Sequence, residues 1–324
     1  MFTRRLFVGG ALAAPAVFAA GRASAQEMVL RAVSVFQEGT AFSRPFEAFM
    51  QKVNEEGRGL VRINFIGGPR AMPPFEIGNA IRNGVVDMAN TSAAFYANLL
   101  PAGGAIRLST RPWAEIRQNG GWALINRLHN ERLNAWYLAR HGSEIPFHLY
   151  TTREISGPDL RGWTIRTTPT YSAFFTALGA NLVTTPPGEV YTALERGVVQ
   201  GYGWPAVGIF DLGWHERTRF RVDPGFYSVD VSIQVNLRRW QAMRDEQRAF
   251  LTEVAAWLEA GESERARREI AAEFARMEQA GIRVITFQGA DRERWLNTAA
   301  EAGWAEIFQQ APEHAAELRR LLAA

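Results

Sequence analysis

Arg166 is the residue of this sequence whose position best suits ligand chemistry. It follows the apolar segment GWTI (162–165), typical of a strand, and precedes YSAFFTALG (171–179), typical of an amphipathic helix. Thr168 suits the cap of that helix and Pro169 its first turn. A guanidinium beside a helix N-terminus can hold a carboxylate through two hydrogen bonds. Arg166 can equally be a surface arginine paired with an acid, and position alone does not choose between these interpretations.

Catalytic and cofactor motifs are absent from the rest of the sequence. There is no HExxH, GxSxG or P-loop pattern, and no cysteine. The segment GYGWPA (201–206) spaces its glycines like a dinucleotide fingerprint, but Pro205 and the lack of a suitably placed acid argue against one. The five histidines, at positions 129, 141, 148, 215 and 314, lack metal-ligand spacing. We therefore predict no catalytic residue, no cofactor and no metal site.

The first 25 residues are typical of an export signal. An arginine pair at Arg4 and Arg5 precedes an apolar run from Leu6 to Ala20, and Ala-Ser-Ala ends at Ala25. The start resembles a twin-arginine signal, and the run is too short for the alternative, a retained membrane anchor. Cleavage after Ala25 lowers Lys plus Arg from 36 to 33, against 33 Asp plus Glu. We expect a near-neutral exported protein, which argues against nucleic-acid binding.

One phrase of the sequence occurs twice. PPFEIGNAIRNGVVD (73–87) and PPGEVYTALERGVVQ (186–200) align without a gap, 113 positions apart. In each copy the prolines suit the start of a helix, Gly84 or Gly197 suits its end, and the Val-Val pair is expected to enter a strand. The copies are too far apart for a solenoid. They predict two similar α/β lobes.

The remaining patterns predict alternating strands and helices in both halves of the chain. Strands are expected at 28–36, 60–66, 147–152, 162–168, 231–236 and 282–287. Helices are expected at 45–54, at about 113–140, at 245–280 as one long helix or two broken near Gly261, and in the tail. Such alternation calls for sheets covered by helices.

The stretch from Asp159 to Pro205 also carries a family resemblance. DLRGWTIR, the helix ending in LGA, the proline-containing link, EVYTALERGVVQG and the closing Trp-Pro together resemble the DctP-type extracytoplasmic solute-binding proteins of TRAP transporters. The resemblance extends with lower specificity over the mature chain, including the first copy of the phrase and VNLRRW (235–240).

This resemblance implies a fold and a function. The fold is a pair of α/β lobes of the type II periplasmic-binding-protein kind, with a ligand cleft between them and a long connecting helix. We expect residues 26–145 plus 230–270 in lobe I and 146–229 plus 271–324 in lobe II. The function is capture of a small organic carboxylate in the periplasm and its delivery to a TRAP permease, by a protein expected to be a monomer. A secreted enzyme or a sensory protein on the same scaffold is the alternative.

The resemblance also implies ligand-binding residues. The family's carboxylate-pairing arginine falls on Arg166, and Trp204 stands where the branch for 2-oxo acids and related monocarboxylates carries Trp. Gly203 replaces an acid that often holds a cation there, so a metal-assisted site is not expected. Phe147 falls near a second arginine of the sialic-acid branch, which this chain lacks. Tyr171 starts the helix after Arg166.

The first lobe is expected to contribute from the matching place. The candidates are Ser92 and Tyr96, just after the first copy of the phrase, and Phe36, at the end of the first strand. Ordinary core packing is the alternative for each. The ligand stays open among dicarboxylates, 2-oxo acids, aromatic acids and sugar acids.

Overall fold

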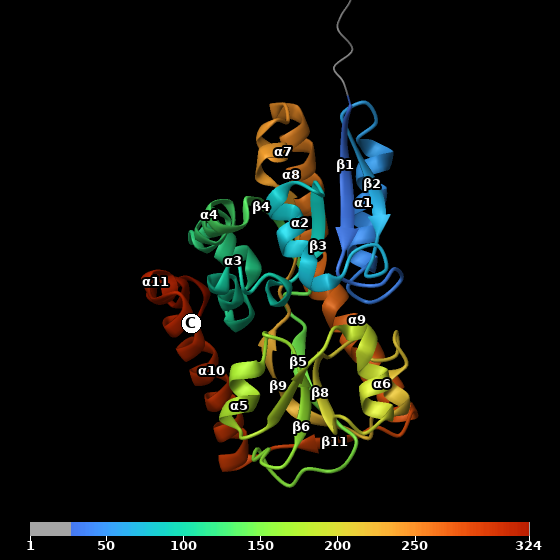
Figure 1. The fold of residues 1–324 in the computed structure, drawn as a ribbon, viewed down its shortest axis with the longest axis vertical. Coiled ribbons are helices and arrows are strands. Elements are labelled where there is room, and N and C mark those ends of the chain that lie inside the picture. Colours follow the sequence, from blue (N-terminus) through green and yellow to red (C-terminus); the bar gives the residue numbers. More distant parts are fainter. Residues whose placement is uncertain (1–26, 324) are drawn as a thin grey trace, which may run out of the picture.

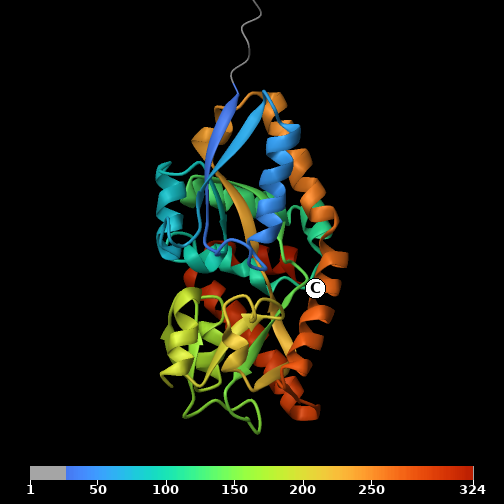
Figure 2. The same ribbon diagram turned by 90° about the vertical axis from the view of Figure 1, so that its right-hand side faces the viewer.

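The protein consists of two α/β lobes, one above the other in Figure 1. The structure is a computed structural model that describes residues 27–323, so the expected signal at 1–25 lies outside the described residues. Each lobe contains one sheet, and the chain passes between the lobes several times (Figures 1 and 2). No helix in the described part is long and apolar enough to cross a membrane.

The first lobe is built on a five-stranded sheet of order β2-β1-β3-β10-β4. The strands are β1 (Met28–Ser34), β2 (Val61–Gly67), β3 (Met88–Thr91), β4 (Ala135–His141) and β10 (Val231–Asn236). β1 runs parallel to β2 and β3, whereas β10 runs antiparallel to β3 and β4. Helix α1 (Arg44–Glu56) buries the apolar face that the sequence predicts, namely Phe46, Phe49, Met50 and Val53.

Within the described residues, the first lobe contains five more helices and three 3-10 segments. They are α2 (Ile77–Asn83), α3 (Trp113–Gln118), α4 (Gly121–Leu133), α7 (Leu237–Gln241) and α8 (Asp245–Ala260), with the 3-10 segments η1 (Pro74–Glu76), η2 (Ala93–Phe95) and η3 (Pro101–Leu108). The expectation of helix throughout 113–140 was wrong at its end. Asn134 adopts a left-handed conformation with φ of 48°, which ends α4 and lets the buried strand β4 begin.

The second lobe is built on a six-stranded sheet of order β11-β9-β5-β8-β6-β7. The strands are β5 (Pro146–Thr151), β6 (Thr164–Thr167), β7 (Asn181–Thr184), β8 (Gly201–Pro205), β9 (Phe220–Ser228) and β11 (Arg283–Thr286). Its helices are α5 (Ser172–Ala177), α6 (Val190–Glu195) and α10 (Gly289–Gln310), with the 3-10 segments η4 (Pro187–Glu189) and η5 (Trp214–Glu216). β7 and β9 were not expected from the sequence.

The two copies of the phrase fold alike, one in each lobe. Each copy forms a 3-10 turn followed by a short helix, η1 with α2 and η4 with α6. The strands start later than expected, at Met88 and Gly201, and Val85 and Val198 are exposed. Their backbone N–H groups return to the carbonyls of Ala80 and Ala193, so both valines close the helix end.

Helices also connect the lobes. α8 is followed by α9 (Glu262–Gln279), and the break lies at Gly261, near where the sequence places it. The expected division put residues 271–324 in lobe II. Helix α11 (Pro312–Leu322) packs instead against the first lobe. Asn119 donates to the carbonyl of Leu321 over 2.9 Å, and the buried Leu318 and Leu322 face η3 and α4, because the helix is amphipathic and finds its apolar partner there.

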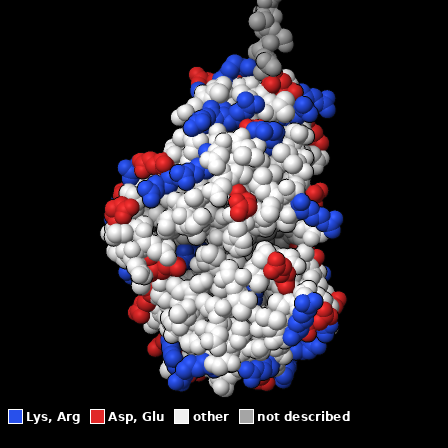
Figure 3. Space-filling model, viewed as in Figure 1, with Lys and Arg blue, Asp and Glu red and all other residues white. Residues whose placement is uncertain are grey.

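Charged side chains do not form a single-sign surface on the face seen in Figure 3. Arginines and acids alternate around both lobes, and the middle of this face is largely uncharged.

Candidate functional site

A small cavity, with a solvent-accessible volume of about 40 Å³, lies where the two lobes meet. Its walls are mostly apolar and come from both lobes and from the β9–β10 connection. The lining residues are Phe36, Phe42, Ser92, Ala94, Phe95, Phe147, Thr168, Thr170, Tyr171, Pro187, Trp204, Pro205, Val229, Asp230 and Val231. A concave, apolar site with a few polar groups is the usual form of a small-molecule site.

Arg166 lies in contact with this cavity's wall and is fully buried. Its Nε and Nη2 donate to the carbonyl of Thr185 over 3.1 and 2.6 Å, and its Nη1 donates to the Tyr171 hydroxyl over 2.8 Å. The guanidinium also lies 5.9 Å from the centre of the Trp204 ring. Tyr171 and Trp204 line the cavity themselves, so they connect Arg166 to it.

The charge of Arg166 has no counter-ion among residues 27–323. Among the described residues it forms no ion pair, and all three of its hydrogen-bond acceptors are neutral. Burial lowers the pKa of Arg166 because water cannot solvate the charge. The interaction with Tyr171 raises this pKa, but less than burial lowers it. Three of the five N–H groups are used, which leaves one on each terminal nitrogen for both oxygens of a carboxylate.

Tyr171 occupies the space beside Gly203. Its hydroxyl donates to the Gly203 carbonyl over 2.6 Å, and a Cβ added at Gly203 would lie 2.6 Å from the tyrosine ring. A side chain at position 203 is therefore incompatible with this arrangement, including the acid that the family resemblance associates with a cation. Within residues 27–323 no group of three or more acidic or histidine side chains could hold a metal ion.

Trp204 packs tightly but keeps one unsatisfied group. Its ring centre lies 4.6 Å from that of Trp214 and 6.2 Å from that of Phe42. Its indole Nε1 is buried with no hydrogen-bond partner among the described residues. A buried donor without an acceptor is costly.

Of the other expected residues, four line the cavity and one does not. Phe36, Ser92, Phe147 and Tyr171 are part of its wall. The side chain of Tyr96 is instead buried inside the first lobe, where its hydroxyl lies 3.0 Å from His129 Nε2 and 3.0 Å from Gln234 Nε2. The 3-10 turn η2 lies between Ser92 and Tyr96, and of these two residues only Ser92, at its cap, faces the cavity.

The expected cap of the second-lobe helix was also wrong. α5 begins at Ser172 rather than at Pro169, and Thr168 makes no side-chain cap. The carbonyl of Thr168 accepts from the Ser172 hydroxyl over 2.9 Å, while Thr168 itself lines the cavity.

Five lining residues of the polar or aromatic type were missed in the sequence: Phe42, Phe95, Thr168, Thr170 and Asp230. Thr168 and Thr170 follow Arg166 closely, so proximity to it was a usable signal. Asp230 had none, because its contacts with Ser92 and Ala93 join positions 138 and 137 residues apart.

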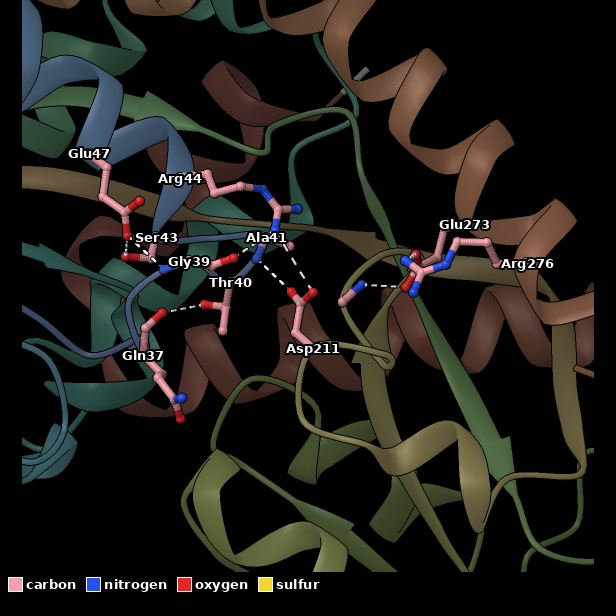
Figure 4. Close-up of polar contacts among 11 residues, drawn as sticks. Gln37, Gly39, Thr40, Ala41, Ser43, Arg44, Glu47, Asp211, Glu273 and Arg276 are labelled. Carbon is pink, nitrogen blue, oxygen red and sulfur yellow. Dashed lines mark hydrogen bonds and ion pairs between the residues drawn. The ribbon is translucent and has the colours of Figure 1, made fainter.

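The two lobes are in direct contact beside a neighbouring pocket, which shares Phe36, Phe42 and Trp204 with the cavity (Figure 4). Asp211 of the second lobe accepts a hydrogen bond from the backbone N–H of Ala41 in the first lobe, over 2.6 Å. Arg44 Nη1 lies 3.8 Å from the other oxygen of Asp211. Glu47 holds the first-lobe loop by accepting from Gly39 N and Ser43 Oγ. The structure therefore shows a closed arrangement of the lobes.

Two α/β lobes that meet at a cavity, with an unpaired arginine in contact with two residues of its wall, are the arrangement of a bilobed solute-binding protein. The comparison with protein families agrees. Residues 33–311 match the family described as bacterial extracellular solute-binding protein, family 7 (DctP), and the chain belongs to this family. The resemblance drawn from residues 159–205 is thereby confirmed.

Individual relatives are more distant. A monocarboxylate 2-oxoacid-binding periplasmic protein of Nostoc sp. is 26% identical over 215 residues, a match that covers 62% of this chain and 57% of that protein. The chain therefore aligns with little more than half of this curated relative.

Solved structures share the fold over nearly their whole length. A TRAP periplasmic solute-binding protein of Desulfovibrio salexigens with bound orotic acid superposes with a TM-score of 0.80 at 18% identity, covering 91% of this chain and 97% of that one. An extracytoplasmic solute receptor of Bordetella pertussis that binds pyroglutamic acid gives 0.81 at 15% identity, covering 91% and 99%. A TRAP solute-binding protein of Ralstonia eutropha with bound (S)-2-acetolactate gives 0.78 at 18% identity, covering 91% and 98%. The predicted two-lobed α/β fold is confirmed.

Proposed function

We propose that this protein captures a small organic carboxylate in the periplasm and delivers it to the membrane permease of a TRAP transporter. A 2-oxo acid or another monocarboxylate is the favoured ligand. The observation that carries the proposal is the buried charge of Arg166, which has free N–H groups and no counter-ion among the described residues. The name of the Nostoc relative and the acids bound in the solved relatives support it.

The ligand carboxylate pairs with Arg166 in this proposal, and the rest of the ligand packs among aromatic rings. Phe36 and Ser92 contact it from the first lobe, and Phe147, Tyr171 and Trp204 from the second. Because the ligand touches both lobes, only the closed state makes all contacts, and binding shifts the population towards that state. Micromolar affinity requires about 8 kcal/mol, which a desolvated ion pair and aromatic burial can supply.

A thermal-shift screen over carboxylates tests the proposal. A ligand at about 100 times its dissociation constant adds about 2.7 kcal/mol of stability, which for a protein of this size raises Tm by roughly 5 °C. We expect such a shift with at least one small monocarboxylate, and recovery of the acid unaltered after incubation, as a binding protein requires. No shift with any monocarboxylate would contradict the assignment of Trp204, and turnover of the acid would favour a secreted enzyme.

Replacing Asp211 with alanine tests the closed state. The variant loses the bond to Ala41 N and the weaker 3.8 Å pairing with Arg44, both of which join the two lobes, and Asp211 is not part of the cavity wall. We expect every ligand to bind about 5-fold more weakly, since one such contact contributes ~1 kcal/mol. Calorimetry with several acids measures this, with Asp245→Ala as control because the Asp245 side chain is 98% exposed. Losses that differ strongly between acids would show instead that Asp211 contacts the ligand.

A further inference from the structure

Asp230 is a carboxylate in the wall of the cavity that the proposed binding of a carboxylate at Arg166 does not use. It lies in the connection between β9 and β10, where the chain passes from the second lobe to the first, and only 2% of its surface is exposed. Its Oδ1 accepts from the Ser92 hydroxyl over 3.0 Å, and its Oδ2 accepts from the backbone N–H of Ala93 over 2.9 Å.

These two bonds orient Asp230 without using all of its acceptor capacity. A carboxylate offers about four lone-pair positions, and the first-lobe partners take one on each oxygen. Among the described residues Asp230 forms no ion pair. A buried carboxylate with unused acceptors is expected to take further hydrogen-bond donors where it borders the cavity.

Apart from Asp230, no described charged residue is part of this cavity's wall. Asp230 also borders a second pocket, whose wall includes Arg107 and Glu306, and these two side chains pair with each other. Arg140 attracts Asp230 electrostatically but forms no ion pair with it. It is fully buried, donates to the carbonyl of Val229 over 2.6 Å, and is not part of the cavity wall.

Arg166 belongs to the second lobe and forms no ion pair with Asp230. A ligand in the cavity therefore has Arg166 on one side, next to the lining residues Tyr171 and Trp204. The carboxylate of Asp230 is part of the cavity wall itself.

We propose that Asp230 determines specificity, by accepting a hydrogen bond from a hydroxyl or N–H group of the ligand and repelling a second carboxylate. This inference rests on the proposed function and narrows its ligand class to monocarboxylates that carry a hydrogen-bond donor, so that a 2-hydroxy acid rather than a 2-oxo acid is expected to bind most tightly. A ligand that puts a donor on Asp230 completes the hydrogen bonding of a buried charge, whereas an analogue without one leaves it incomplete. A dicarboxylate places like charges together in a site with little water. Ser92 acts in this proposal as a positioning residue, because its hydroxyl is bound to Asp230.

Two matched series of acids test the proposal by calorimetry on the mature protein. The first is propionate, lactate, pyruvate and methylmalonate, which differ only in the group on carbon 2. The second carries a phenyl group on carbon 3 and suits the aromatic wall: 3-phenylpropionate, 3-phenyllactate, phenylpyruvate and benzylmalonate. Each is measured with the wild type, with Asp230→Asn, and with Asp245→Asn as the matched exposed control. Tm without ligand shows that each variant is folded.

In the wild type we expect the hydroxy acid of the better-binding series to bind at least 10-fold more tightly than its unsubstituted, 2-oxo and dicarboxylate partners. Asp230→Asn should reduce that preference to less than 3-fold and strengthen binding of the dicarboxylate, while Asp245→Asn changes neither. Equal binding of hydroxy and unsubstituted acids by the wild type would overturn the role of Asp230, and needs no variant to be seen. Equal preferences in Asp230→Asn and the wild type would overturn it too. Binding of none of the eight acids, together with no thermal shift from any carboxylate of the screen, would contradict the proposed function itself.

Discussion

Arg166→Ala should weaken binding of the carboxylate ligand at least 30-fold. The variant leaves the ligand's carboxylate buried in the closed cavity without a counter-ion, and losing one partner of a buried charge pair costs at least ~2 kcal/mol. Arg166→Lys should recover only part of the loss, because an ammonium cannot reproduce the paired N–H groups of a guanidinium. Isothermal titration with the best acid from the thermal-shift screen measures both variants.

The matched control for this prediction is Arg161→Ala. Arg161 lies in the same lobe, its side chain is 82% exposed, and its partner is Asp159 on the surface. Its replacement should leave the affinity unchanged. Equal affinity of Arg166→Ala and Arg161→Ala would refute the assignment of Arg166 as the carboxylate-binding residue.

The free energy of unfolding should fall steeply as the pH is lowered from about 6.5 towards 4. Burial lowers the pKa of His129 to about 4 and that of His141 to about 3, whereas a histidine in the unfolded chain has a pKa near 6.5. Below pH 6.5 the unfolded chain therefore takes up protons that these two folded imidazoles do not. Stability is fully present above that pH, and each histidine removes about 1.4 kcal/mol per pH unit until its folded pKa is reached.

Urea denaturation between pH 7.5 and 5 measures this slope. His129→Gln and His141→Gln should each reduce it by about one proton, and the double variant by about two. His314→Gln, on α11, is the control and should keep the slope of the wild type. A double variant with the wild-type slope would show that other groups cause the acid sensitivity.

The fold was predictable from the sequence where the signal was local. Each copy of the doubled phrase contains prolines that start a helix and a glycine that ends it, with φ of 74° at Gly84 and 68° at Gly197. The same local pattern therefore predicted the helix in both lobes. β9 was missed because Pro224 and Gly225 in its middle are typical strand breakers. The sheet tolerates them because the pairing of β9 with β5 is irregular at that point. That irregularity arises between distant segments and leaves no local pattern.

The site divided in the same way. Arg166 was identifiable because the strand before it, the helix after it and the family pattern lie within one continuous stretch. Tyr96 was misplaced because position after the phrase does not reveal the 3-10 turn η2, which separates it from Ser92. The positions of Asp230 and Asp211 could not be predicted from the sequence, because each contacts a partner more than a hundred residues away along the chain.

A crystal structure of the protein with the tightest-binding acid of the screen tests the central claim most directly. We expect the ligand between the lobes, with its carboxylate oxygens within hydrogen-bond distance of Arg166 Nη1 and Nη2 and its remainder in contact with Phe36 and Trp204. A carboxylate bound elsewhere in the cleft, with Arg166 still bonded only to Thr185 and Tyr171, would contradict it.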